Sequence, residues 1–137
     1  MAKTVVDSYA WIEHFRRAST GPSRVEACAE RGDDLYTPSV VLAEVARKFH
    51  RDHLGAPVAH RRMEQIALMS SLAELDREVA GAAAEADPEL RRWAKERSLE
   101  APGLFDAIVL GTARKLGAKV LTGDRHFEGL ADTEWMG

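Results

Sequence analysis

The sequence predicts an α/β fold built around a mainly parallel sheet. Short apolar runs of strand length alternate along the chain with longer segments that have helical periodicity, as βαβ units require. Two of the short runs lead directly to an aspartate: KTVVD ends at Asp7, and AKVLTGD ends at Asp124. Parallel sheets form their sites outside the carboxyl ends of the strands. A chain of 137 residues is expected to fold as a single domain, 1–137, with its own core.

The first half of the chain is expected to contain three strands and four helices. In chain order these are a strand at 3–7, helices at 8–15 and 21–31, a strand at 33–39, helices at 40–53 and 58–70, and a strand at 70–75. Ser39 is placed to cap the helix that follows it, and Gly55 with Pro57 is placed to end that helix.

The second half is expected to be mainly helical, with two short strands near its end. The sequence predicts helices at 76–86, 88–98 and 104–117 and strands at 118–122 and 133–136. Asp87 is expected to cap a new helix that has Pro88 at its first position. Gly117 is expected just past the end of the third helix.

Composition excludes several classes of protein. The single cysteine, Cys28, cannot form an internal disulfide and rules out a multi-cysteine zinc site. No run approaches the ~20 apolar residues of a membrane span, so no membrane partner is expected. The N-terminus does not read as a signal peptide, which predicts a cytoplasmic location.

Basic residues are clustered although the net charge is −3. The clusters are RKFHRDH at 47–53, HRR at 60–62 and RRWAKER at 91–97. Each is accounted for either as a solvated helix face or as a set of contacts to nucleic-acid phosphates. The helices after residues 47 and 91 are expected to supply such contacts, which position a nucleic acid without reading its sequence.

Four carboxylates stand in apolar surroundings. Asp106 lies within GLFDAIVLGTA and Glu44 within VVLAEVA, while Asp7 and Asp124 follow the two strand-like runs. Two carboxylates ~4 Å apart repel by roughly 4 kcal/mol at an effective dielectric constant of 20, so several together need a cation. Oxygen ligands without cysteine select Mg²⁺ or Mn²⁺ over zinc, and such ions recruit phosphate oxygens. The implied chemistry is phosphodiester hydrolysis.

Each carboxylate also has a purely structural interpretation. Asp7 could cap the following helix, and Glu44 could pair with Lys48 one turn on. Asp106 could favour a helix dipole, and Asp124 could be a turn residue. The four considered together favour a shared site.

Neighbouring polar residues could support that site. The hydroxyls of Ser8 and Thr122 could orient a carboxylate or make local turn bonds. Arg125 and His126 could contact phosphate or be ordinary exposed loop residues.

Four motifs make the chain resemble the PIN-domain ribonucleases, and within them the VapC toxins of toxin–antitoxin pairs. The motifs are VVDSYAWIE, PSVVLAEVARK, FDAIVLGTARKLG and VLTGDRHF, and the resemblance covers essentially the whole chain. It implies that Asp7, Glu44, Asp106 and Asp124 form a catalytic, metal-binding acidic site, supported by Ser8 and Thr122. The chain departs from the pattern at Pro102–Gly103 and at Gly123, without losing a functional group.

The resemblance implies a three-layer α/β/α PIN-like fold with a mainly parallel sheet of about five strands. It also implies a Mg²⁺- or Mn²⁺-dependent endoribonuclease, the toxin of a type II pair, with an RNA substrate such as tRNA, an antitoxin partner and a homodimeric assembly. One alternative is a non-catalytic PIN-like module that binds RNA or protein. Another is a phosphatase with a nucleophilic aspartate, but that chemistry needs a second aspartate two residues after Asp7, where this chain has Tyr9.

Overall fold

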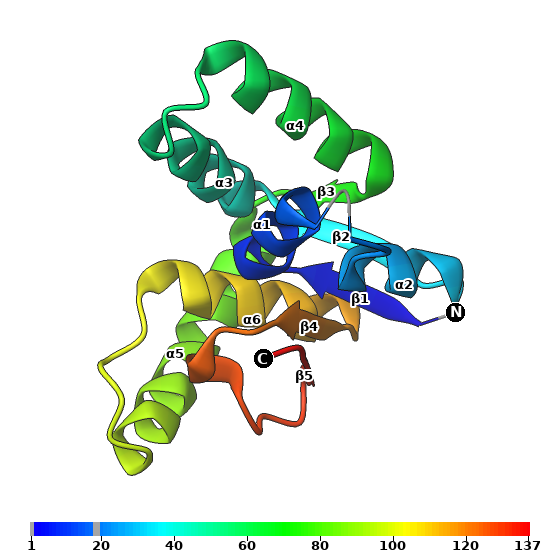
Figure 1. Cartoon of the computed structure of the whole chain (residues 1–137). Helices are drawn as coiled ribbons and strands as arrows, with labels where there is room; N and C mark the ends of the chain where they lie inside the picture. The colour runs from blue at the N-terminus through cyan, green and yellow to red at the C-terminus, as the bar shows by residue number, and fades with distance from the viewer. Residues whose placement is uncertain (1, 18–19) are drawn as a thin grey trace.

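Five parallel strands form a single sheet with the order β3-β2-β1-β4-β5 (Figure 1). The computed structural model describes residues 2–17 and 20–137. The strands are β1 (Lys3–Val6), β2 (Asp34–Pro38), β3 (Ser71–Ala73), β4 (Lys119–Thr122) and β5 (Thr133–Trp135). The predicted five-stranded parallel sheet is therefore confirmed.

Helices cover both faces of this sheet and produce the expected three layers (Figure 1). They are α1 (Ser8–Arg16), α2 (Arg24–Glu30), α3 (Ser39–Arg51), α4 (Ala56–Met69), α5 (Arg77–Glu96) and α6 (Leu104–Leu116). Helix α6 contacts the central strands and α5 packs along it, while α1 and α2 lie on the opposite face. Helices α3 and α4 form an antiparallel pair that extends from the sheet at the top of Figure 1.

The core lies at the two central strands. Val5 and Val6 of β1 and Val120 and Leu121 of β4 have no solvent-exposed surface. A strand covered on both faces needs apolar residues at successive positions, which explains the uninterrupted apolar runs in the sequence. The register pairs Val6 with Leu121, so the two strands end side by side.

Helix α5 corrects the prediction of two helices that meet at Asp87. It runs unbroken from Arg77 to Glu96 with Pro88 inside it, and Asp76 caps it by accepting a hydrogen bond from the Val79 backbone N–H at 2.9 Å. Its buried residues are Val79, Ala83, Ala86, Leu90 and Ala94, a stripe that continues across the proline. Packing of this stripe on α6 outweighs the local cost of the proline.

Some helix boundaries also differ from the prediction. Helix α3 begins at Ser39 itself, and no side chain caps it, so the predicted Ser39 cap is wrong. The helix ends at Arg51, and Pro57 lies in the first turn of α4 instead of ending α3. A 3₁₀ turn, η1 (Arg125–Phe127), was not predicted and is separated from the end of β4 by Gly123 and Asp124.

The strand order reverses between β1 and β4, which is the topological switch point of the sheet. From β1 the chain moves outward through β2 and β3, then returns to the other side of β1 as β4. Ligand sites of such sheets form where the strand order reverses, outside the carboxyl ends of the strands. The residues that follow Val6 and Leu121 therefore lie where a site is expected. Within residues 2–17 and 20–137, no helix is both long and apolar enough to cross a membrane.

Candidate metal centre

Asp7 lies at the carboxyl end of β1 and is 5% exposed. The Thr122 hydroxyl, at the end of the adjacent strand β4, donates a hydrogen bond of 2.8 Å to Asp7 Oδ2. Asp7 is the N-cap residue of α1, but its side chain makes no capping hydrogen bond. The side-by-side ends of β1 and β4 therefore fix this carboxylate.

Burial raises the pKa of Asp7 to about 6. The hydrogen bonds from Thr122 and from the Ser8 backbone oppose this shift, and the charges of Asp106 and Asp124 add to it. The electrostatic effect of both aspartates shows that they lie close to Asp7. A buried carboxylate near two others is costly to ionise unless a cation is present.

Glu44 joins these aspartates from α3. Burial, together with the charges of Asp7 and Asp106, raises its pKa to about 7. The predicted pair with Lys48 does not form, because Lys48 Nζ lies 3.0 Å from Asp52 Oδ1. Glu44 has no hydrogen-bond partner among the described side chains, so its carboxylate remains available to a ligand.

Asp106 lies in the first turn of α6. Its Oδ2 accepts a hydrogen bond of 3.0 Å from the Gly103 backbone N–H, so the predicted helix-end role is real. Burial and the charge of Asp124 nevertheless raise its pKa. Helix capping holds this carboxylate in place but does not neutralise it.

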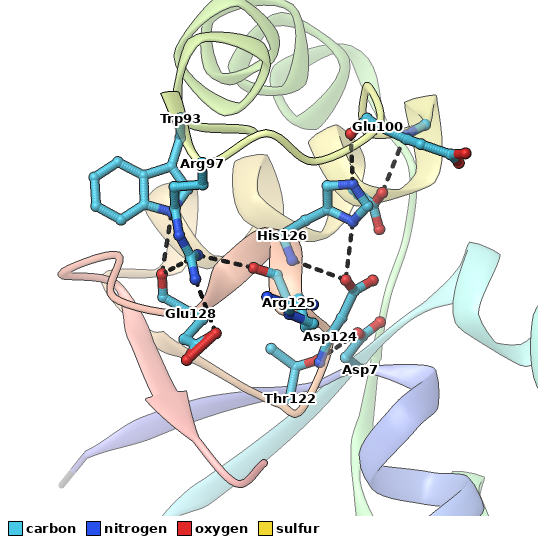
Figure 2. A network of polar contacts seen from close by, with 11 residues as sticks. Asp7, Trp93, Arg97, Glu100, Thr122, Asp124, Arg125, His126 and Glu128 are labelled. Carbon is cyan, nitrogen blue, oxygen red and sulfur yellow. Dashed lines mark hydrogen bonds and ion pairs between the residues drawn. The ribbon is translucent and has the colours of Figure 1, made fainter. Parts of the chain in front are cut away.

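Asp124 lies between β4 and η1 and is the N-cap residue of η1. Its Oδ1 accepts a hydrogen bond of 2.9 Å from the His126 backbone N–H, as a turn aspartate does, and contacts His126 Nδ1 at 2.9 Å (Figure 2). The Asp124 backbone N–H donates to Thr122 Oγ1 at 3.0 Å. Thr122 thus connects Asp7 with Asp124 and is fully buried.

His126 belongs to the cluster, a role the sequence did not indicate. Ligand atoms of Asp106, Asp124 and His126 all lie within 4.8 Å of one another. The second ring nitrogen, Nε2, lies 2.8 Å from the Glu100 carbonyl oxygen. Burial lowers the pKa of His126, but the bonds with Glu100 and Asp124 outweigh that effect and raise it.

A set of polar contacts holds the η1 turn against the end of α5 (Figure 2). Arg97 Nη1 donates to the carbonyl oxygens of Arg125 at 3.1 Å and Glu128 at 2.7 Å, and Nη2 donates to Glu128 Oε2 at 2.8 Å. Trp93 Nε1 donates to the Glu128 carbonyl at 3.1 Å. These bonds position the segment that carries Asp124 and His126.

Two arginines of the predicted basic clusters make contacts within the chain. Arg62 lies over the rings of Phe15 and Phe49, 5.1 and 4.5 Å from their centroids. Arg91 pairs with Asp87 on the same helix at 2.8 Å. Arg47, by contrast, is exposed, and its charge lowers the pKa of Glu44, which places it near the carboxylates.

The donor set fits a hard divalent cation. The charges of Asp106 and Asp124 contribute to the raised pKa values of Asp7 and Glu44, and the charge of Asp124 contributes to that of Asp106. His126 contacts Asp124. Oxygen-rich sites of this kind suit Mg²⁺ or Mn²⁺. The Ser8 hydroxyl has no hydrogen-bond partner among the described side chains, so its supporting role stays a prediction.

Solved structures with the same fold include several toxin–antitoxin proteins. A VapBC2 structure from Rickettsia felis, bound to a DNA fragment from its promoter, matches with a TM-score of 0.72 at 11% sequence identity. The match covers 99% of this chain and 100% of the Rickettsia chain. A toxin–antitoxin complex from Klebsiella pneumoniae has a TM-score of 0.68 at 16% identity, with coverages of 96% and 95%. VapBC-1 from nontypeable Haemophilus influenzae has a TM-score of 0.67 at 14% identity, with coverages of 98% and 96%.

Sequence comparison identifies the family. No curated protein sequence matches this chain. The model of the PIN domain matches residues 4–132, which include all four carboxylates and Thr122. This match and the parallel five-stranded sheet show that the chain belongs to the PIN-domain family.

Proposed function

We propose that this protein is a Mg²⁺- or Mn²⁺-dependent endoribonuclease and the toxin of a type II toxin–antitoxin pair. One observation supports the proposal: Asp7, Glu44 and Asp106 come from separate elements and have raised pKa values, and the charge of Asp124 contributes to each of these shifts. A divalent cation held by these carboxylates would activate water and stabilise the charge that develops on a scissile phosphate. Membership of the PIN-domain family supports a nuclease.

The chain's own residues have distinct roles in this proposal. Asp7, Asp106 and Asp124 hold the cation, and each is oriented by a bond from Thr122, Gly103 or the His126 backbone. Glu44 completes the ligand set or orients the attacking water, because no described side chain restrains its carboxylate. Arg47 lies near enough to Glu44 to contact an RNA phosphate.

The proposed partners are RNA, a cognate antitoxin and a second copy of this chain. The Klebsiella and Haemophilus structures are described as a toxin–antitoxin complex and a VapBC protein, which supports the antitoxin. A protein segment covering the carboxylates would block RNA and so inhibit cleavage. Structured RNAs such as tRNA, in the cytoplasm, are the proposed substrates.

Cleavage of a mixed RNA pool that includes tRNA tests this function. The purified chain, free of antitoxin, is incubated with Mg²⁺, with Mn²⁺ and with a chelator. We expect cleavage with either metal and none with the chelator. Asp106→Asn should reduce the cleavage rate by at least ~100-fold, because it removes a negative charge that would hold the cation. The asparagine keeps an oxygen that can accept the hydrogen bond from the Gly103 backbone N–H, so the helix cap is retained.

A matched variant separates site chemistry from a general change of charge. Asp87→Asn removes an α5 carboxylate that pairs with Arg91 and should leave the rate unchanged. Equal cleavage by wild type and Asp106→Asn would contradict the assigned site. Tight RNA binding with no metal-dependent turnover would favour the non-catalytic PIN-like module.

A further inference from the structure

A hollow is lined by residues of α1, α3 and the end of the chain. Its volume is about 370 Å³, within the ~300–1,000 Å³ range of sites that hold small ligands. Its lining consists of Tyr9, Ile12, Glu13, Arg16, Lys48 and Met136. These residues combine an aromatic ring and apolar side chains with two cations and one anion.

Two residues that line the hollow are close in the chain to two of the carboxylates. Tyr9 follows Asp7 by two residues, in the first turn of α1. Lys48 follows Glu44 by one turn of α3. A ligand that places a phosphate at the carboxylates would therefore have its neighbouring part within reach of this hollow.

The Tyr9 ring is held in place although it is 46% exposed. It packs against Gly123, the residue between Thr122 and Asp124, so closely that a Cβ built on Gly123 would lie 2.6 Å from Tyr9 Cζ. The glycine is needed here for space, since any side chain would displace the ring. A fixed ring with an exposed surface is a platform on which a nucleobase can stack.

Two cationic side chains of the lining, Arg16 and Lys48, could contact a phosphate of an RNA backbone. Arg16 is 64% exposed in its side chain, and its nearest carboxylate oxygen, Asp52 Oδ2, is 3.9 Å away. Lys48 contacts the same aspartate at 3.0 Å. The anion of the lining, Glu13, accepts a bond of 3.3 Å from the Arg24 backbone N–H. Arg16 is thus the cation most available to a phosphate.

We infer that this hollow is a subsite that holds the nucleotide next to the scissile phosphate, with its base stacked on Tyr9. The inference rests on the RNA substrate of the proposed function and adds a binding contact to it. Stacking on an aromatic ring tolerates any base, because every base has a flat π-surface. Tyr9 therefore contributes affinity for single-stranded RNA without a preference for one base.

Binding of a fluorescein-labelled single-stranded RNA of random sequence tests the subsite, with Ca²⁺ in place of Mg²⁺. Tyr9→Ala should weaken binding about tenfold, whereas Tyr9→Phe, which keeps the ring, should stay within about twofold of wild type. Leu68→Ala is the matched control, because Leu68 is an 86% exposed apolar residue on α4. Melting temperatures of all variants establish that each is folded.

Photocrosslinking locates the base directly and does not depend on turnover. Thiouridine-substituted RNA should crosslink to the peptide that contains Tyr9. Crosslinks confined to α5 or α6, or wild-type affinity in Tyr9→Ala, would overturn the subsite even if metal-dependent cleavage is present. Crosslinking at Tyr9 without any cleavage would instead support the subsite and count against the nuclease function.

Discussion

Glu44 shows how a single residue among these carboxylates carries an energetic cost. Its carboxylate is partly buried on α3 among three aspartates, and its pKa is raised to about 7. In the unfolded chain the ordinary value is 4.5. The folded protein therefore binds this proton more tightly than the unfolded chain does, and ionising Glu44 opposes folding.

Glu44→Gln is expected to stabilise the metal-free protein in a pH-dependent way. The native state keeps the Glu44 proton up to about pH 7, so wild-type stability falls as the pH rises from 4.5 through 7, whereas glutamine does not titrate. Above pH 7 the free energy of unfolding of the variant should exceed that of wild type by about 1 kcal/mol, a value that allows for solvent screening of this partly exposed group. Near pH 4.5 the difference should vanish. Urea unfolding in chelator measures the difference.

An exposed glutamate provides the control for this experiment. Glu64→Gln on α4 changes the same group in an exposed position and should leave stability nearly unchanged across that pH range. If Glu44→Gln raised the free energy of unfolding equally at every pH, the result would contradict an electrostatic cost of ionising Glu44.

Thr122 illustrates the opposite case, a polar residue that is fully satisfied. Its hydroxyl donates to Asp7 and accepts from the Asp124 backbone N–H, and it has no exposed surface. One side chain thus sets the relative position of two carboxylates that are distant in sequence. That arrangement explains why a threonine, and not a larger polar residue, suits the end of β4.

At the scale of elements, the end of α5 acts as a support for η1. Arg97 donates three hydrogen bonds to that turn and to Glu128 just after it, two of them to backbone carbonyls. Arg97→Ala should lower the free energy of unfolding by about 1–2 kcal/mol, because those carbonyls lose a charged donor. It should also weaken metal-dependent cleavage, since Asp124 and His126 are carried by the same turn.

Arg91 on the same helix gives the comparison for Arg97. It is 58% exposed in its side chain and pairs with Asp87 one turn away. Arg91→Ala should cost less than about 0.5 kcal/mol and leave cleavage intact. Equal effects of the two variants would mean that the Arg97 contacts do not position the turn.

The contact between α5 and α6 depends on Gly111. A Cβ at this position would lie 2.6 Å from the Ala83 backbone nitrogen, so the helices would have to separate. Gly111→Ala should destabilise the protein by about 1–3 kcal/mol in urea unfolding, because overpacking forces backbone shifts. Gly81→Ala in α5 meets nothing within 4 Å and should be neutral or stabilising by up to about 1 kcal/mol.

That pair of glycines also tests the packing that keeps α5 continuous through Pro88. If Gly111→Ala were as stable as wild type, the close approach of the two helices would not be a major source of stability. Their tight contact would then fail to explain why the proline is tolerated.

For the whole molecule, sequence reasoning succeeded where the evidence was local. Apolar runs that end on Asp7 and near Asp124 predicted both the strands and the edge where polar residues gather. It failed where the cause lies in distant contacts. The continuity of α5 depends on α6, and the place of His126 depends on the Glu100 carbonyl from another loop. Such contacts leave no periodic pattern in the sequence.

The whole fold should respond to the cation that the site is proposed to hold. Ionised Asp7, Glu44 and Asp106 destabilise the metal-free protein at neutral pH, because burial and mutual repulsion raise the pKa of each. A cation that binds the native state and not the unfolded chain stabilises it by about 2.7 kcal/mol at one hundred times its Kd. Mg²⁺ or Mn²⁺ should therefore raise the melting temperature of wild type.

Asp106→Asn makes that response diagnostic. The variant keeps an oxygen that can accept the Gly103 hydrogen bond but removes one charge of the cluster, so it should melt at or above wild type in chelator. Added Mg²⁺ or Mn²⁺ should then shift its melting temperature much less than that of wild type. Differential scanning fluorimetry over a metal titration measures both values. The charge of Asp106 raises the pKa of both Asp7 and Glu44. An equal metal-induced shift of the melting temperature in the two proteins would therefore mean that the cation binds elsewhere.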